Sequence, residues 1–297
     1  MTSALPWHRP LVESLETCLR ANRLPHAVLL AGPEGWGERH LANWLALAIL
    51  GLDGAADAST VAHPDLRWLE PESSMIKVDE VRELVSFAQG TPQAGARKVA
   101  VLAKAHFLNQ SSANALLKTL EEPPPGTHLV LASAHPGGLL PTIRSRCQTF
   151  VIRPDADAAR AWLAAQFPGV DLDRAWFEHG GAPIAVQTAL ERGEEPLDAL
   201  LEQWLEEGAS RTAVETLLAA DLADALGRWY RYLLALAGGQ WRPARLGAVS
   251  RRALMAFADE LSWVRRQLAT SNSTNERLMA ERLLARWRTL PAGDVSL

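Results

Sequence analysis

Residues 27–39 read AVLLAGPEGWGER, a short apolar run followed at once by a glycine-rich turn. The run has the length and composition of a buried strand, and residues 41–50 continue with the pattern of a buried helix. Strand, glycine-rich turn and helix in this order are the context of a phosphate-binding P-loop, G-x-x-x-x-G-K-[ST]. Gly32 and Gly37 have the required spacing. The stretch therefore predicts either an inherited P-loop or an ordinary glycine-rich turn.

The chemistry of a P-loop is missing from this stretch. In a P-loop the glycines let backbone N–H groups wrap a phosphate, the lysine neutralises its charge, and the hydroxyl holds magnesium. Here Gly35 lies within the loop, Glu38 takes the lysine position and Arg39 the hydroxyl position. A carboxylate repels a triphosphate, and a guanidinium cannot ligate a cation. We therefore expect a degenerate nucleotide loop.

The rest of the first half alternates short apolar runs with helical patterns. Apolar runs recur at 99–103, 129–132 and 147–152, and helical spacing covers 77–87 and 111–120. Strands that alternate with helices form parallel sheets joined by crossovers. The expected fold of this half is therefore α/β with a parallel sheet.

The end of the run at 99–103 tests the ATPase interpretation. An ATPase of this class carries an acidic pair there, which holds magnesium and activates water. Ala103 and Lys104 stand in those positions instead. For His106, which follows, we favour a structural or capping role over a catalytic one, since no carboxylate or nucleophile is near it in sequence.

The second half is expected to be helical. Residues 155–197 hold three basic and eight acidic residues, which suggests a small acidic helical module. We expect three domains: an α/β core at 1–154, a small helical lid at 155–197 and a helical domain at 198–297. The last domain should contain helices near 198–207, 211–237, 250–268 and 274–290. Core positions in these helices are expected for Trp204, Trp229, Trp263 and Trp287.

Composition excludes several classes of protein. A net charge of -4 does not favour a protein that grips DNA by bulk charge. The two cysteines lie far apart and the eight histidines show no ligand spacing, so we expect no metal site. No apolar run reaches about 18 residues and no signal pattern is present, so we expect a cytoplasmic protein without a membrane partner.

Three stretches resemble bacterial DNA polymerase III clamp-loader subunits, which are AAA+ proteins. They read NQSSANALLKTLEEPP at 109–124, LPTIRSRC at 140–147 and LPHA at 24–27, and IKVDEVR at 76–82 is similar to a fourth family segment. Together they cover most of residues 20–152. The resemblance implies an AAA+ type core, a small helical lid and an all-α collar that joins subunits.

The resemblance is to the delta-prime branch, whose members lack ATP chemistry of their own. The motor subunits, tau or gamma, keep the lysine and the acidic pair, whereas Glu38, Arg39, Ala103 and Lys104 replace them here. Ile184 stands where motor subunits carry a nucleotide-sensing arginine. No intrinsic ATPase activity is therefore expected, although the family belongs to the polymerase III holoenzyme.

The resemblance also assigns a role to Arg146, in the S-R-C motif. It is similar to the family's arginine finger, which would act in trans on ATP bound by a neighbouring subunit; the alternative is a surface salt bridge. A guanidinium is planar, always charged and suited to a phosphate oxygen. We expect Cys147 to be a small buried residue rather than a nucleophile, and Lys118 and Glu122 to form a solvated pair on one helix face.

The expected partners follow from the family. They are the tau/gamma and delta subunits, with the sliding clamp and primer-template DNA reached through the complex. No cofactor is expected: ATP would be bound by a neighbour, and residues 50–63 lack the cysteines of the zinc module common in relatives. The expected function is that of a non-catalytic subunit that helps load the sliding clamp. The alternatives are an active AAA+ motor subunit and, less favoured, a DNA-binding module.

Overall fold

A computed structural model gives the fold of the chain. It describes residues 4–52, 54, 56–71, 75–194, 196–219, 221–239, 249–270 and 275–290. The chain divides into two compact units, residues 1–162 and 163–297. The division into three domains expected from the sequence stays a prediction.

The N-terminal unit is built on a five-stranded sheet in the order β2-β3-β4-β1-β5. Every ladder in it is parallel. The strands are β1 (Ala27–Ala31), β2 (Leu66–Leu69), β3 (Lys98–Leu102), β4 (Thr127–Ser133) and β5 (Gln148–Val151). Because all strands run the same way, their carboxyl ends meet at one edge of the sheet.

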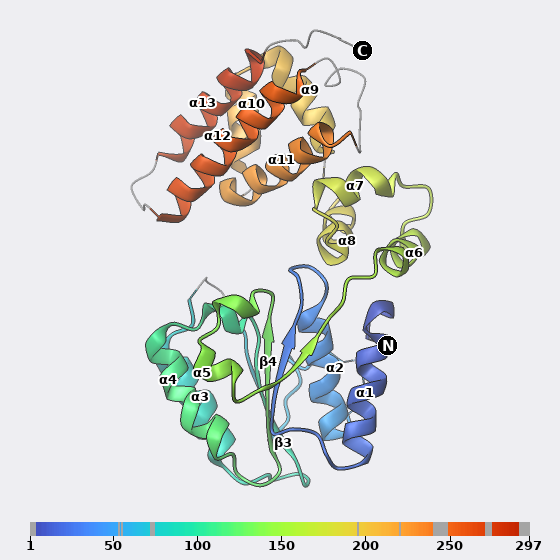
Figure 1. Ribbon diagram of the computed structural model, residues 1–297, viewed down its shortest axis with the longest axis vertical. Helices are drawn as coiled ribbons and strands as arrows, with labels where there is room; N and C mark the ends of the chain where they lie inside the picture. The colour runs from blue at the N-terminus through green and yellow to red at the C-terminus, as the bar shows by residue number, and fades with distance from the viewer. Residues whose placement is uncertain are drawn as a thin grey trace. The chain divides into compact units, whose positions relative to one another are not determined.

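Helices cover both faces of this sheet. In Figure 1, α1 and α2 lie on one face and α3 and α4 on the other. The helices are η1 (Pro6–His8), α1 (Arg9–Arg20), α2 (Glu38–Leu50), α3 (Val78–Gln89), η2 (Ala105–Phe107), α4 (Gln110–Glu121), η3 (Pro136–Gly138), α5 (Pro141–Arg144) and α6 (Ala156–Gln166). Every residue of β1 and β3 is buried, which explains why these strands read as continuous apolar runs rather than as alternating ones.

The four expected apolar runs form β1, β3, β4 and β5, and the parallel α/β class is confirmed. The fifth strand, β2, was missing from the sequence prediction. Its four residues, LRWL, include Arg67 and lie at an edge of the sheet, where only the first is buried. A short, half-exposed edge strand leaves too little pattern to detect.

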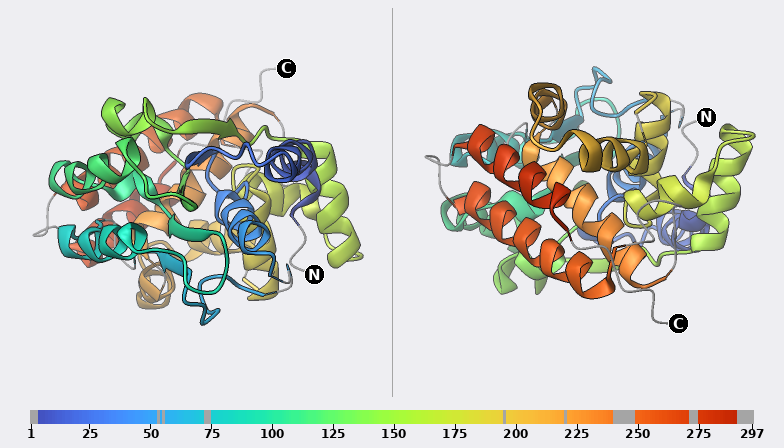
Figure 2. Two further views of the ribbon diagram at one scale, coloured as in Figure 1. Left: turned by 90° about the horizontal axis from the view of Figure 1, so that it is seen from below. Right: turned by 90° about the horizontal axis from the view of Figure 1, so that it is seen from above.

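The C-terminal unit is helical throughout its described residues, as expected. Its helices are α7 (Leu172–Glu178), α8 (Pro183–Glu191), α9 (Leu197–Glu207), α10 (Arg211–Ala219), α11 (Leu222–Ala237), α12 (Arg251–Thr270) and α13 (Glu276–Arg288). Figure 2 shows α11, α12 and α13 side by side. Trp229 is fully buried at their centre, with ring centroids of Trp204, Phe257 and Trp287 at 5.4, 5.1 and 5.3 Å.

Two expectations for this unit were wrong. The single helix expected over 211–237 is two helices, because the side chain of Asp221 caps α11 by accepting the Asp224 N–H at 3.0 Å. Trp263 is 40% exposed rather than in the core, and the guanidinium of Arg282 lies over its ring at 5.5 Å.

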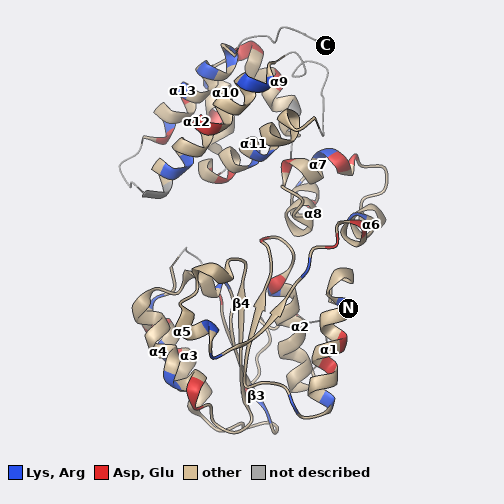
Figure 3. Ribbon diagram, in the orientation of Figure 1, with Lys and Arg blue, Asp and Glu red and all other residues tan. Residues whose placement is uncertain are grey.

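In Figure 3, ribbon segments coloured for basic and for acidic residues alternate along α12 and α13. Within the described residues, no helix is both long and apolar enough to cross a bilayer.

Helix α2 is bounded by two glycines in the left-handed conformation. Gly37 at its N-cap has φ 88° and Gly51 at its C-cap has φ 68°. A Cβ on Gly37 would clash with Leu5 Cδ1 and lie 3.0 Å from His8 Cε1, whereas a Cβ on Gly51 would meet nothing within 4 Å. The start of α2 therefore requires glycine for its conformation and for its packing.

Alanine at these two positions separates the two requirements. Gly51→Ala should lower the free energy of unfolding by about 1–2 kcal/mol, for the left-handed conformation alone. Gly37→Ala should cost roughly 1–3 kcal/mol more, because the added methyl group overpacks Leu5 and His8. Denaturant unfolding of both variants measures the difference, and equal losses would contradict the packing argument.

Candidate functional site

The glycine-rich loop, residues 32–37, connects β1 to α2 at the carboxyl edge of the sheet. Gly32 donates its N–H to the carbonyl of Ser133, the last residue of β4, at 3.3 Å. Gly35 and Gly37 have φ of 74° and 88°, which only glycine adopts without strain. The loop therefore keeps the backbone geometry that its sequence predicts.

Contacts inside the protein hold this loop in place. The carbonyl oxygen of Trp36 accepts hydrogen bonds from Trp7 Nε1 and His8 Nε2, both at 2.9 Å. The Trp36 side chain is buried and stands edge-on to Trp7, at 5.7 Å between ring centroids. Trp7 in turn stands edge-on to Trp162 at 5.4 Å. Contacts within the protein, from η1 and an aromatic cluster, therefore support the conformation of the loop.

Glu38 is the first residue of α2 and is half-buried. Burial, followed by the charges of Glu34 and Glu70, raises the pKa of its carboxyl, and its own backbone N–H opposes this. An acid at this position supplies none of the positive charge that a P-loop lysine provides.

Arg39 is bonded to three side chains. Its Nε donates to Glu70 Oε2 at 2.7 Å, and its Nη2 donates to Asp57 Oδ2 at 3.3 Å and Ser59 Oγ at 3.2 Å. The guanidinium also lies over the ring of Trp68, 5.2 Å from the centroid. The hydroxyl position of the motif therefore holds a cation that is already paired with two carboxylates.

Glu70 links this arginine to the end of β3. Lys104 Nζ lies 3.5 Å from Glu70 Oε1, and Trp68 Nε1 donates to Glu70 Oε2 at 3.2 Å. Ala103, the other expected acid position, is buried and donates its N–H to the carbonyl of Leu69. We call Arg39, Glu70 and Lys104 the Glu70 cluster. Burial alone would raise the pKa of Glu70, but the hydrogen bond and charge of Arg39, with Trp68 and Lys104, lower it.

The Glu70 cluster does not fit magnesium and a triphosphate. Magnesium requires oxygen ligands. In a P-loop one of them is the hydroxyl of a serine or threonine, and Arg39 occupies that position here. The end of β3 offers the methyl group of Ala103 and the ammonium of Lys104. The one carboxylate between these positions, Glu70, is already shared by two cations. In the described part of the chain, no group of three His, Cys, Asp or Glu side chains could hold a metal ion.

His106 lies in η2, beside the end of β4. Its Nδ1 is 3.4 Å from Ser133 Oγ, and its ring is 5.1 Å from that of His135. Burial, then the charge of His135, lowers the pKa of His106. Sequence analysis did not predict Ser133 as its neighbour, because the two residues lie 27 positions apart. Ser133 Oγ also accepts the His135 N–H at 3.2 Å, so the hydroxyl serves the turn after β4.

Arg146 belongs to a separate cluster, after α5. Its Nε donates to Glu121 Oε1 at 2.7 Å, its Nη2 also pairs with that oxygen, and its Nη1 donates to the carbonyl of Thr142 at 2.9 Å. The Arg146 side chain is 33% exposed. The structure therefore contains the salt bridge that was the alternative expectation for this residue.

Two neighbouring expectations have different outcomes. The pair between Lys118 and Glu122 is not formed: α4 ends at Glu121, and the next residue leaves the helical conformation with φ -130°. Cys147 is half-buried, and burial raises the pKa of its thiol to about 12, so it stays protonated at neutral pH.

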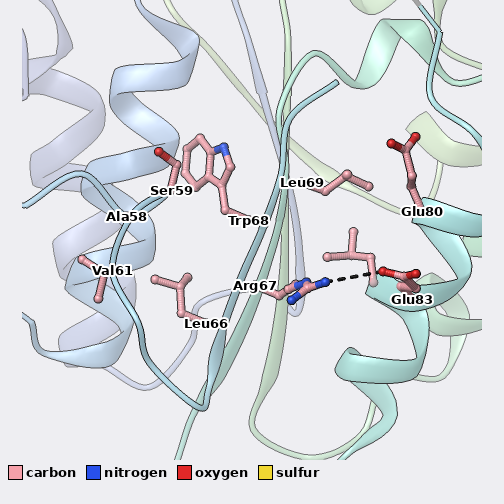
Figure 4. Close-up of a pocket in the computed structure, with 10 residues that line it drawn as sticks. Ala58, Ser59, Val61, Leu66, Arg67, Trp68, Leu69, Glu80 and Glu83 are labelled. Carbon is pink, nitrogen blue, oxygen red and sulfur yellow. Dashed lines mark hydrogen bonds and ion pairs between the residues drawn. The ribbon is translucent and has the colours of Figure 1, made fainter. Parts of the chain in front are cut away.

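A cavity of about 330 Å³ lies beside β2 (Figure 4). Its lining includes Ser59 and Trp68, which also contact Arg39, but no residue of the loop. Arg67 donates to Glu83 across it at 3.4 Å. The cavity is therefore a feature of the sheet edge that adjoins the Glu70 cluster.

Sequence reasoning missed Glu70, Asp57 and Glu121, the acids that hold the three site cations. The position of Glu70 could have been recognised from the sequence, because Glu70 comes just after β2 and Lys104 comes just after β3, so both lie at the carboxyl edge of the sheet. Detecting it required β2 to be identified first.

Removing the Glu70 charge should destabilise the N-terminal unit. Glu70→Gln should lower the free energy of unfolding by roughly 1–3 kcal/mol, because Arg39 and Lys104 lose their shared anion. The control Glu83→Gln removes a carboxylate from the exposed pair with Arg67 and should cost less than about 1 kcal/mol. Denaturant unfolding at pH 7 measures both.

The same cluster predicts a pH dependence. The pKa of Glu70 is lower in the folded state than in the unfolded state. The ionised carboxylate therefore adds to the free energy of unfolding above the unfolded-state pKa, and this stabilisation is lost as pH falls through the folded-state pKa. The stability gap between wild type and Glu70→Gln should shrink in acid. A gap that is the same at pH 7 and pH 3 would argue against an ionic role.

His8 should make the unit acid-sensitive at milder pH. Burial lowers its pKa to about 4, opposed by its hydrogen bond to Trp36. The neutral, buried form of His8 stabilises the fold fully above the unfolded pKa of 6.5. As pH falls toward 4, the free energy of unfolding should decrease by up to about 3 kcal/mol, because the unfolded chain binds the proton more readily. Hydrogen exchange of β1 amides between pH 7 and 4.5 should show the loss, and His8→Gln, which keeps a donor, should show a shallower slope. Parallel slopes would refute the assignment.

Comparison with known proteins places the chain in a family. The model of the family "DNA polymerase III, delta subunit" matches residues 7–156. The DNA polymerase III subunit delta' of Pseudomonas aeruginosa is 34% identical, over 98% of this chain and 99% of the relative. The Escherichia coli subunit delta' is also 34% identical, over 54% of this chain and 52% of the relative.

Two further matches concern related subunits. The DNA polymerase III subunit tau/gamma of Haemophilus influenzae is 33% identical over 48% of this chain and 22% of its own length. The crystal structure of a gamma subunit-related protein from Thermotoga maritima superposes with a TM-score of 0.59 at 21% identity, covering 92% of this chain and 98% of that one, and so supports the fold. From the family model and the full-length match, the chain belongs to the DNA polymerase III subunit delta' family.

Proposed function

We propose that this chain is a non-catalytic clamp-loader subunit. It assembles with tau/gamma and delta subunits, helps them load the sliding clamp onto primed DNA, and donates Arg146 to ATP bound by a neighbouring subunit. The observation that carries the non-catalytic part is the Glu70 cluster, whose carboxylate binds the residues at the magnesium-binding positions of an ATPase.

Electrostatics support the absence of intrinsic ATP hydrolysis. Hydrolysis requires a lysine on the terminal phosphates and carboxylates that hold magnesium. Glu38 brings an acid to the phosphate position, and Arg39 and Lys104 bring cations to the metal positions. The charge is reversed at Glu38 and Lys104, and at Arg39 a cation replaces a neutral hydroxyl, so the chain is proposed to carry no resident nucleotide or magnesium. No zinc is proposed either, because residues 50–63 lack cysteines.

Arg146 supports an action on a neighbour. An arginine that stabilises charge on a transferring phosphoryl group contributes on the order of 10³–10⁵ in rate in other systems. Arg146 is partly exposed and is separate from the Glu70 cluster, so nothing in the degenerate loop occupies it. The sliding clamp and primer-template DNA would be reached through the assembled complex, in the cytoplasm.

One observation favours the alternative, an active motor subunit. The loop retains Gly35 and Gly37 in the left-handed conformation at the start of a helix, which is the backbone geometry of a phosphate site. Nucleotide binding therefore distinguishes the two functions.

Titration calorimetry with ATP and magnesium tests the proposal directly. The purified chain should give no binding heat up to millimolar nucleotide, while a tau/gamma subunit measured in the same buffer should bind. A matched variant, Glu38→Lys with Arg39→Thr, restores the two motif residues and shows whether they alone limit binding. Micromolar binding by the wild-type chain would overturn the non-catalytic function and favour the motor subunit.

A further inference from the structure

We propose that Glu121 is a positioning residue for Arg146. It holds the guanidinium in one orientation, with donors left over for a phosphate on a neighbouring subunit. This inference rests on the proposed function, because it assigns a partner within the chain to the arginine that would act in trans.

The contacts define a single orientation of the guanidinium. Glu121 is the last residue of α4, and Arg146 lies between α5 and β5. Arg146 Nε and Nη2, which share one edge of the guanidinium, both contact Glu121 Oε1. On the other side, Nη1 donates to the carbonyl of Thr142, within α5. Anchors on two different helices fix both the position and the plane of the group.

A count of donors shows what remains available. A guanidinium has five N–H bonds. Glu121 accepts two of them and the Thr142 carbonyl accepts one, which leaves two, one on each terminal nitrogen. Of these two, the N–H on Nη1 makes a long hydrogen bond of 3.5 Å to the Ser145 hydroxyl, a weak partner that a phosphate oxygen can replace. Two N–H bonds on neighbouring nitrogens match two oxygens of a phosphate group. The carboxylate thus leaves the arginine able to bind a phosphate in a preset orientation.

Preorganisation is the physical benefit of this arrangement. A free arginine side chain loses rotamer entropy when it docks on a phosphate. Donors already fixed where charge develops need little reorganisation during the reaction. Because Glu121 is 47% exposed and Arg146 33% exposed, the pair contributes little to the stability of the fold. Loss of the pair should therefore affect activity far more than stability.

The next residue provides a matched control. Glu122 is also exposed, carries the same charge and follows the same helix end, and its carboxylate makes no hydrogen bond or ion pair with the described residues. Glu122→Gln therefore changes the net charge as Glu121→Gln does but leaves Arg146 in place.

The experiment uses the full chain reconstituted with tau/gamma and delta subunits, sliding clamp and primed DNA. ATP hydrolysis by the complex is measured with Arg146→Ala, Glu121→Gln, Glu122→Gln, and Arg146→Ala combined with Glu121→Gln. Glu121→Gln should lower kcat roughly tenfold with KM for ATP unchanged, because the arginine loses its orientation while ground-state ATP binding belongs to the neighbour. Glu122→Gln should match wild type, and the double variant should equal Arg146→Ala.

The outcomes separate this inference from the proposed function. If Arg146→Ala lowers kcat but Glu121→Gln behaves as Glu122→Gln, the positioning role is refuted and the finger stands. If Glu121→Gln raises kcat, the carboxylate restrains the arginine instead, which also refutes the role. If Arg146→Ala leaves kcat unchanged, the proposed action of Arg146 on a neighbouring subunit's ATP is refuted. Should Glu121→Gln not assemble, Glu121→Asp, which keeps the charge, must give a kcat between wild type and Arg146→Ala.

Discussion

Strand β1 is hydrogen-bonded to β4 on one edge and to β5 on the other, and all five of its residues are buried. This pairing fixes where the chain leaves the sheet and therefore where the loop and α2 begin. Gly32 lies so close to Ile152, the residue after β5, that a Cβ would come within 2.9 Å of the Ile152 Cβ. The loop geometry is consequently tied to the packing of the sheet.

The substituted residues at the end of the sheet compensate one another electrostatically. Placing Arg39 and Lys104 at neighbouring positions would bring two cations together, and Glu70 supplies the anion between them. Asp57 and the ring of Trp68 stabilise the same guanidinium. A single reversion, such as an acid in place of Lys104, would add a second carboxylate beside Glu70. A magnesium site at this position would therefore require several simultaneous changes.

The parts of the fold that could be predicted are those with a local physical cause. The apolar runs of β1 and β3, the glycine spacing of the loop and the helical periodicity of the second half each depend on near neighbours in sequence. The missed features depend on distant partners. Glu70 meets Arg39 across 31 positions and Glu121 meets Arg146 across 25. No periodicity encodes such pairs, and Trp263 is exposed because its position on α12 faces outward, which its residue type does not reveal.

Two arginines of this chain illustrate how the same chemistry serves different ends. Arg39 donates to two carboxylates and a hydroxyl and packs on an indole, so its bonding capacity is directed into its own unit. Arg146 follows α5 and precedes β5, donates to one carboxylate and one carbonyl, and has beyond these only a long 3.5 Å hydrogen bond to the Ser145 hydroxyl. On the proposed function, a cation of this chain is useful only where another subunit supplies the phosphate. The contrast between these two arginines is therefore a structural reason to test for function in trans.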